Sequence, residues 1–293
     1  MLSYLEYLGK TAAKWLGCGL PPKSISIGTN TPVTAIEDKN GNWGYDRPIV
    51  LIIHGAWQHP AYYQTFIQVL QSRGYETHCP RLPSCGGQIP PTKSLEDDVE
   101  FIRKFTAELT DTGRLVDVIM HSYGGIVGTD ALCGFGVEDR LKRGAVGGVR
   151  NLIYLTSFVP QKGQSLFGMF EGQSLPTVEI NEETKLISAT SPIPMFYNDL
   201  PDEEAEYWVK QMVVHPHSAH STPVGNEAFR EFPVTYIICE NDKGILPEVQ
   251  QMMVDKIKAV GVEVRVERCT GSHCPFLSMP YGTADIIDKI ANS

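Results

Sequence analysis

The chain has 293 residues, of which 42% are apolar and 20% are charged, and its formal net charge is −9. This composition is typical of a globular protein and excludes a wholly disordered chain. The acidic balance also disfavours a broad surface for nucleic acid or anionic lipid, and the length allows one large domain or two of ordinary size.

The seven cysteines are scattered along the chain and include no Cys-x-x-Cys pair. Disulfide frameworks belong to short secreted chains, so reduced thiols are expected here. No apolar run approaches the roughly 18 residues that a membrane-spanning helix needs. These features predict a cytoplasmic protein without a membrane span.

Residues 1–46 are expected to form an extension ahead of the main domain. Leu5, Leu8 and Trp15 recur at helical spacing, and charged residues interrupt the apolar run. The pattern favours an amphipathic helix packed on the domain or on a second subunit, which leaves a homodimer open, over membrane-surface contact or a signal peptide. Two strand-like pieces, around Ser24–Ile27 and Thr31–Ile36, are expected to form a hairpin.

From Pro48 onward, apolar strands alternate with helices. The run Ile49–Ile53 is typical of a strand that is buried on both faces of a parallel sheet. Further strands are expected at Tyr75–Cys79, Leu115–Met120, Asn151–Leu155, Val234–Cys239 and Val262–Arg268, and helices at Ala61–Ser72, Ser94–Leu109, Gly124–Leu132, Glu248–Val260 and Thr283–Ala291. This alternation predicts an α/β fold with a doubly wound, mostly parallel sheet.

The interval between Leu155 and Val234 departs from this rhythm because it contains no clear strand. A structureless loop of about 75 residues is uncommon in a compact domain, and Pro201–Trp208 looks like the start of a capped helix. The interval is rich in aromatic residues and methionine. Residues 158–225 are therefore expected to form a helical cap over a pocket, between core segments 47–157 and 226–293.

The segment Val118–Gly125 carries the strongest local signal for chemistry. An apolar strand runs into Ser122, and two glycines open the next helix, as in a nucleophile elbow. The usual pattern is Gly-x-Ser-x-Gly, and Met120 occupies the first position, where a small residue normally relieves crowding. Ser122 is the predicted nucleophile.

An oxyanion hole requires an earlier strand whose following loop lends a backbone N–H. The segment His54-Gly55-Ala56-Trp57 follows the first strand in this way. The N–H groups of Ala56 and Tyr123 are therefore the predicted oxyanion donors, and His54 is expected to be a packed histidine.

The remaining partners of Ser122 are expected after two later strands. Asp242 follows the strand that ends at Cys239 and is the predicted carboxylate, with Glu240 as the fallback. His273 follows the last strand, and no histidine lies beyond it. The chain order Ser122, Asp242, His273 predicts a catalytic triad.

These residues resemble the α/β-hydrolase superfamily and, within it, the branch of plant methylesterases, hydroxynitrile lyases and their fungal relatives. The resemblance spans about residues 47–290 and rests on the segments His54–Trp57, His121–Gly125, Asp242–Gln250 and Gly271–His273. Cyanohydrin-cleaving members place a lysine directly after the catalytic histidine and a threonine in the oxyanion loop. This sequence has Cys274 and Gly55 at those positions, so the resemblance implies an esterase.

The expected reaction is the cleavage of a carboxylic ester or lactone of a small, fairly apolar metabolite, in specialised metabolism, through an acyl-enzyme. No metal or organic cofactor is expected. Two alternatives remain open: the same triad serves C–C cleavage, condensation or cyclisation, or the scaffold is a ligand receptor. The residues expected to contact substrate are Trp57, Phe167, Phe196, Tyr197 and Trp208.

His215, His217 and His220 have a spacing that invites a metal site. They lack an Asp, Glu or Cys at ligand spacing, so metal binding is not expected. One of these histidines could instead line the pocket and contact the substrate.

Overall fold

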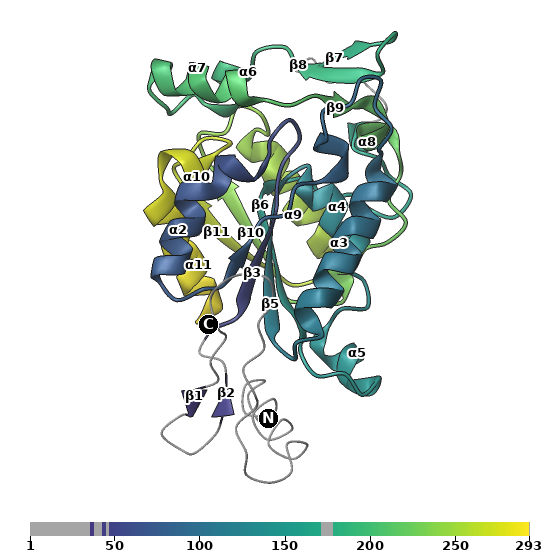
Figure 1. The fold of residues 1–293 in the computed structure, drawn as a ribbon, viewed down its shortest axis with the longest axis vertical. Helices are drawn as coiled ribbons and strands as arrows, with labels where there is room; N and C mark the ends of the chain where they lie inside the picture. Colours follow the sequence, from purple (N-terminus) through teal and green to yellow (C-terminus); the bar gives the residue numbers. More distant parts are fainter. Residues whose placement is uncertain (1–35, 38–42, 45–46, 171–177, 293) are drawn as a thin grey trace.

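In the computed structural model of the chain, residues 36–37, 43–44, 47–170 and 178–292 are described (Figure 1). The expected N-terminal helix and the piece Ser24–Ile27 lie outside these residues, as does all but the end of Thr31–Ile36. The first elements described are β1 (Ile36–Glu37) and β2 (Trp43–Gly44), which pair antiparallel.

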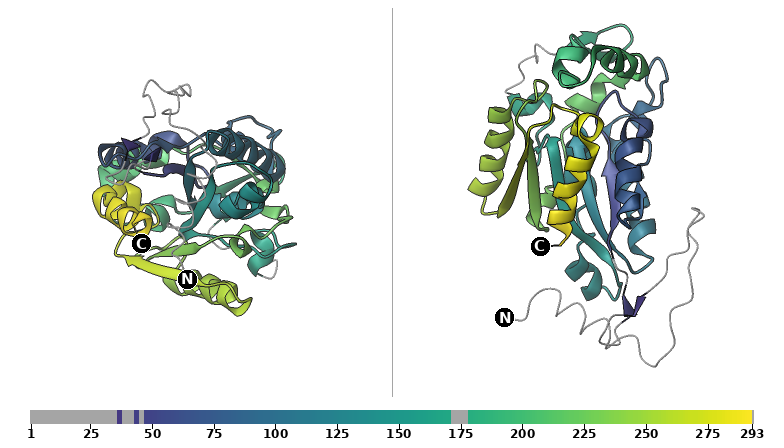
Figure 2. Two further views of the ribbon diagram at one scale, coloured as in Figure 1. Left: turned by 90° about the horizontal axis from the view of Figure 1, so that it is seen from below. Right: turned by 90° about the vertical axis from the view of Figure 1, so that its left-hand side faces the viewer.

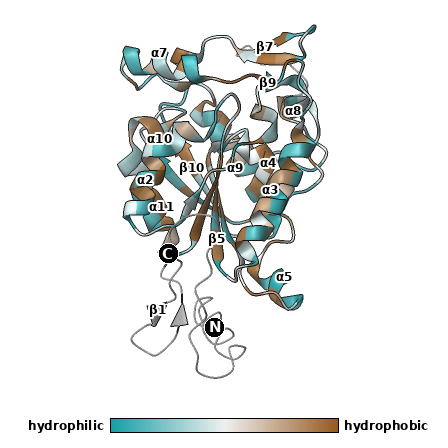
Figure 3. Cartoon of the chain, in the orientation of Figure 1, coloured by the Kyte–Doolittle hydropathy of each residue, from teal (hydrophilic) through white to brown (hydrophobic). Residues whose placement is uncertain are grey.

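The core is a six-stranded sheet in which all neighbouring strands are parallel, as the sequence predicts. In spatial order its strands are β11 (Val264–Cys269), β10 (Val234–Cys239), β6 (Gly148–Ser157), β5 (Leu115–Ser122), β3 (Ile49–Ile53) and β4 (Thr77–His78). Every residue of β3 is fully buried because helices cover both faces of the sheet. Figure 3 shows the strongly apolar character of the central strands.

Helices flank the sheet on both sides (Figures 1 and 2). On one side, α2 (Gln64–Ser72) packs against α11 (Pro280–Ala291), and on the other, α3 (Leu95–Thr110) packs against α4 (Gly124–Ala131). The remaining core helices are α5 (Val137–Lys142), α9 (Pro247–Ala259) and α10 (Pro275–Ser278), with short 3-10 turns at Pro60–Tyr63, Pro83–Cys85, Phe167–Phe170 and Ala228–Arg230. No helix in the described ranges is long and apolar enough to cross a membrane.

The interval between β6 and β10 lies over one end of the sheet (Figure 1). It contains the expected helices, α6 (Pro192–Phe196), α7 (Asp202–Gln211) and α8 (His217–Ser221). Its sequence shows no clear strand, but in the structure β7 (Val178–Asn181), β8 (Leu186–Ala189) and β9 (His215–Pro216) form a three-stranded antiparallel sheet. These strands are too short, and β7 too polar on its exposed side, to show a periodic apolar pattern.

Candidate active site

Ser122 lies at the sharp turn between β5 and α4. Its φ of 52° is in the left-handed region, which residues other than glycine rarely adopt. A Cβ atom on Gly124 would lie 2.2 Å from the carbonyl oxygen of Ile53, and one on Gly125 would lie 2.2 Å from that of Phe158. Both glycines are therefore required where the start of α4 passes the neighbouring backbone, as in a nucleophile elbow.

The packing of α4 explains how Met120 is accommodated in the elbow. The Met120 side chain is fully buried. A Cβ atom on Gly128 would lie only 2.2 Å from its Sδ atom. Gly128 thus provides the room that a small residue at position 120 normally provides. The sequence motif does not reveal this compensation because Gly128 lies in the following helix, outside the pentapeptide.

His273 and Asp242 form a buried pair beside the elbow. The Nδ1 atom of His273 lies 2.8 Å from Oδ2 of Asp242, and the two side chains are 5% and 0% exposed. Glu240, the fallback carboxylate, is instead exposed and lies 3.5 Å from Arg268. The geometry therefore favours Asp242 over Glu240 as the partner of His273.

Four donors besides His273 hold the Asp242 carboxylate in place, and the longest of these bonds, at 3.5 Å, runs from Nε2 of Gln250 to Oδ2. Its Oδ1 accepts the backbone N–H groups of Gly244 at 2.7 Å and Ile245 at 2.9 Å. Its Oδ2, which faces His273, also accepts the hydroxyl of Thr156. These bonds satisfy the buried charge and orient the oxygen that pairs with the imidazole.

The predicted oxyanion residues lie at the same pocket. Ala56 and Tyr123 line it together with Ser122 and His273. Tyr123 is the N-cap of α4, where the helix dipole favours negative charge. Trp57, directly after Ala56, has a φ of 59° that turns the loop sharply. The Ala56 and Tyr123 N–H groups thus belong to the loops that border the nucleophile.

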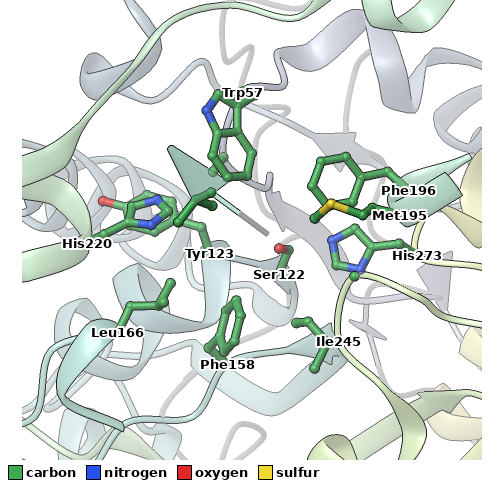
Figure 4. A pocket seen from close by; sticks show the side chains of 13 residues that line it. Trp57, Ser122, Tyr123, Phe158, Leu166, Met195, Phe196, His220, Ile245 and His273 are labelled. Atoms are coloured by element: carbon green, nitrogen blue, oxygen red, sulfur yellow. The ribbon is translucent and has the colours of Figure 1, made fainter. Parts of the chain in front are cut away.

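Two adjoining cavities meet at Ser122 and His273. Figure 4 shows the larger one. The larger encloses about 420 Å³ of space and the smaller about 230 Å³, both including space open to solvent. The larger is lined mainly by apolar side chains, including Phe158, Leu166, Val178, Met195, Phe196 and Ile245. This lining suits a mostly apolar molecule.

The residues expected to contact substrate divide into two groups. Trp57, Phe196 and Tyr197 line the cavities. Phe167 and Trp208 line neither, so the structure does not support that expectation for them. The Phe167 ring stacks on that of His217 with 5.6 Å between the ring centroids, and the centroid of the Trp208 ring lies 4.5 Å from that of Tyr62.

The sequence carries no local signal that marks Phe158, Leu166 and Ile245 as residues that line the pocket. Their apolar side chains carry the same signal as core residues, since only their direction in the fold makes them part of the pocket. The cap interval did stand out for its aromatic and methionine content, and Met195 and Phe196 belong to it.

The histidine after β3 is packed into the core. Burial lowers the pKa of His54 to about 4, so the ring is neutral near pH 7. Its Nδ1 lies 2.9 Å from the carbonyl oxygen of Gly55, and its Nε2 accepts the N–H of Leu82 at 3.0 Å. His54 therefore holds two loops together and does not face the pocket.

The cap histidines and Cys274 have distinct surroundings. His215 and His220 are buried, and His220 lines the larger cavity. Within the described ranges, no group of three or more His, Cys, Asp or Glu residues is placed to hold a metal ion.

Cys274 is buried, its Sγ accepts the Gln58 amide at 3.2 Å, and burial raises the pKa of its thiol.

Known proteins have similar sequences or similar folds. The chain is 30% identical to "Probable hydrolase R7" of the fungus Phoma sp. over 248 residues, which are 84% of this chain and 98% of that protein. It is 31% identical to "Alpha/beta hydrolase nvfD" of Aspergillus novofumigatus over 237 residues, 80% of this chain and 92% of that protein.

Among solved structures, the fold is similar to that of a pyrethroid hydrolase from Sphingobium faniae. The TM-score is 0.66 at 22% identity, and the match covers 84% of this chain and 98% of that one. The sequence model of the alpha/beta hydrolase family matches residues 49–286. Because this match spans most of the chain, the chain belongs to the alpha/beta hydrolase family.

Proposed function

We propose that the protein is a serine hydrolase that cleaves a carboxylic ester or lactone of a small, mostly apolar metabolite. The observation that carries the proposal is the 2.8 Å hydrogen bond between Asp242 and His273 at the pocket that Ser122 lines. A buried carboxylate–imidazole pair beside a hydroxyl on a strained turn has the composition of a Ser-His-Asp triad. The hydrolase names of the two fungal relatives support the reaction class.

In the first half of the proposed reaction, Ser122 Oγ attacks the ester carbonyl carbon while His273 takes the hydroxyl proton. Asp242 accepts the Nδ1–H of His273, so that Nε2 is the basic nitrogen. The N–H groups of Ala56 and Tyr123 stabilise the oxyanion of the tetrahedral intermediate. Loss of one such donor typically raises a barrier by about 2.7–4 kcal/mol.

The following steps release first the alcohol and then the acid, and they restore the free enzyme. The imidazolium of His273 gives its proton to the leaving alcohol oxygen as the C–O bond breaks, which leaves an acyl group on Ser122. Water then attacks this acyl group, and His273 takes a proton from the water. The Ser122 oxygen leaves with that proton, so water is the only co-reactant.

The proposed cap, residues 158–225, is tied to the loop that carries Ala56. The N–H of Val213 donates to the carbonyl oxygen of Trp57 at 2.9 Å, and Nε1 of Trp57 donates to the carbonyl oxygen of Ile187 at 2.9 Å. Trp57 therefore lines the pocket and also joins the core to the cap. This arrangement supports an apolar group of the substrate lying between the two.

The proposal is tested by labelling with a fluorophosphonate probe and by hydrolysis of p-nitrophenyl acetate. The intact protein should be labelled on Ser122 and should hydrolyse the ester, whereas Ser122→Ala should lose both. Ser218→Ala, which changes an exposed serine of α8, is the matched control and should keep both. An intact protein that neither reacts nor hydrolyses the ester, or a label that survives in Ser122→Ala, would overturn the proposal.

A further inference from the structure

His220 is a buried imidazole whose hydrogen-bonding capacity is unused. Its side chain belongs to a residue that is 3% exposed. Neither Nδ1 nor Nε2 has a hydrogen-bond partner within the described part of the chain. A buried donor or acceptor without a partner costs about 1–3 kcal/mol, so each such group in a native structure calls for an explanation.

The position of His220 suggests where its partner comes from. His220 lines the larger cavity together with Ser122 and His273, and Figure 4 shows it on the far side of the pocket from His273. The triad mechanism proposed above uses neither of its nitrogens. An atom of a molecule that enters the cavity and displaces the atoms that cover these nitrogens is therefore a candidate partner.

The neighbouring aromatic rings hold His220 without bonding to its nitrogens. The centroids of Trp57, Tyr123 and Phe167 lie 5.7, 5.5 and 5.6 Å from that of His220. The Trp57 N–H already donates to Ile187, and the Tyr123 hydroxyl donates to Asp98 at 2.9 Å. The polar atoms of these rings are thus engaged elsewhere.

The second buried histidine of the cap does not serve as the partner either. The ring of His215 lies 4.9 Å from that of His220, centroid to centroid, and its Nε2 lies 3.2 Å from the Ser84 hydroxyl. Its Nδ1 has no hydrogen-bond partner among the described residues. The two rings contact each other without a hydrogen bond between them.

The chemistry around His220 favours a neutral oxygen group of a ligand as its hydrogen-bond partner. Burial lowers the pKa of His220 to about 3, so the ring is neutral near pH 7 and has one donor and one acceptor. The described lining of the cavity contains no Asp, Glu, Lys or Arg. An anionic or cationic group would be buried there without a counter-charge, whereas a hydroxyl or carbonyl oxygen would gain a hydrogen bond.

We propose that His220 binds a hydroxyl or keto group that the substrate carries apart from its ester carbonyl. The substrate class is then an oxygenated ester or lactone, with the ester at Ser122 and the second oxygen at His220. This inference rests on the proposed function, because Ser122 defines where the ester lies. The apolar walls hold the carbon skeleton, and the single hydrogen bond sets its direction.

The test compares matched methyl esters of unbranched acids, with and without a terminal hydroxyl, over a series of chain lengths. At the length that reaches His220, the intact protein should show a kcat/KM about three- to tenfold higher for the hydroxylated ester, as one added hydrogen bond predicts. His220→Phe should abolish or reverse this preference, because the hydroxyl would be buried without a partner. His220→Gln, which keeps a donor and an acceptor, should retain part of it.

His217→Phe is the control, since His217 lies on the same helix and lines neither cavity. It should keep the full preference. The inference is overturned if the intact protein shows no preference at any chain length, a result that needs no variant to fold. It is also overturned if His220→Phe keeps the preference of the intact protein.

The two proposals fail in distinguishable ways. If only the inference is wrong, the fluorophosphonate still labels Ser122 and the plain methyl esters are still hydrolysed. If the intact protein neither reacts with the probe nor hydrolyses any ester, the proposed function fails and the inference fails with it.

Discussion

The Nε2 atom of His121 lies 2.8 Å from the main-chain carbonyl oxygen of His273. A carbonyl oxygen only accepts, so the proton between them belongs to Nε2. Burial lowers the pKa of His121 well below its usual value, which keeps the ring neutral. His121 directly precedes Ser122 in β5, so this bond joins the strand of the proposed nucleophile to the loop of the proposed base.

Replacing His121 should therefore impair catalysis even though the three residues of the proposed triad are unchanged. His121→Leu leaves the His273 carbonyl oxygen without its donor and frees the loop to shift. A displacement near 1 Å can cost about 100-fold, so we expect kcat for p-nitrophenyl acetate to fall by about 10- to 100-fold. Stability should fall by about 1–3 kcal/mol in urea unfolding.

Two further variants separate positioning from a general loss of stability. His121→Gln keeps an N–H donor and should recover part of kcat, and His217→Leu on α8 should leave kcat unchanged. A folded His121→Leu protein with the kcat of the intact protein would show that the bond does not position His273.

The contact between Met120 and Gly128 predicts an energetic coupling. Gly128→Ala places a methyl group 2.2 Å from the present position of Met120 Sδ, so it should destabilise the fold by about 1–3 kcal/mol despite the better helix propensity of alanine. Met120→Ala creates the missing room. The double variant should therefore lose less stability than the sum of the two single variants, by about 0.5–3 kcal/mol.

Urea unfolding of the four proteins of this cycle measures the coupling. The control cycle pairs Met120→Ala with Gly225→Ala, whose added Cβ would meet its nearest atom at an ordinary 3.5 Å. The control cycle should be additive. Strict additivity in the Met120–Gly128 cycle would mean that the side chain moves away at no cost.

Asp98 predicts a pH dependence of stability. It is fully buried, and its carboxylate accepts the Ser84 N–H at 2.8 Å and the Tyr123 hydroxyl at 2.9 Å. Burial nevertheless raises its pKa from 3.8 to about 6. Between these values the folded state binds the proton more tightly than the unfolded state does, so the Asp98 contribution to stability falls as pH rises.

Asp98→Asn should remove this contribution. The shift of about two pKa units corresponds to about 3 kcal/mol, so the free energy of unfolding of the variant, minus that of the intact protein, should rise by about this amount from pH 4 to pH 7. Asp202→Asn, in the exposed first turn of α7, is the control for the loss of a carboxylate that is not buried. A flat or falling difference for Asp98→Asn would contradict the prediction.

The parts of the molecule that sequence predicts well are those in which one local pattern has one structural solution. Ile49–Ile53 is short, mostly β-branched and without a polar side chain, which favours a strand buried on both faces, and the structure has it as a fully buried strand. Ser122 ends a strand of the parallel sheet, and Asp242 and His273 follow two further strands of the same sheet. Parallel strands bring their carboxyl ends to one edge, so chain order predicts that these residues lie near one another, and the structure places Asp242 against His273 and lines one pocket with Ser122 and His273.

The sequence predicts the interval between β6 and β10 less well, because tertiary contacts decide its structure. The strands β7 and β8 have four residues each and pair with one another. Strands this short are stabilised by the pairing and do not show an alternating apolar pattern in the sequence. Phe167 and Trp208 are large aromatic residues of the kind that often line pockets. Their rings instead contact those of His217 and Tyr62. Side-chain direction of this kind follows from packing, which a single sequence does not encode locally.

Thr156 supports the candidate triad from β6. It is fully buried, its φ of 37° is in the left-handed region, and its hydroxyl donates to the same Asp242 oxygen that faces His273. A β-branched residue in this backbone conformation is strained, and such strain persists only where the surrounding structure requires it. The requirement here is a donor that fixes the Asp242 carboxylate.

Thr156→Val keeps the shape of the side chain and removes this donor. Hydrogen bonds to charged groups contribute about 1.5–3 kcal/mol, so we expect kcat for p-nitrophenyl acetate to fall by at least about tenfold as the carboxylate loses its orientation. Thr156→Ser should restore most of the activity because it returns the hydroxyl. Thr129→Val is the matched control, since the Thr129 hydroxyl pairs at 2.8 Å with that of Tyr154 and not with Asp242. If the two valine variants lose stability equally but kcat falls only at position 156, Thr156 positions the carboxylate, whereas equal kcat values would reduce it to a packing residue.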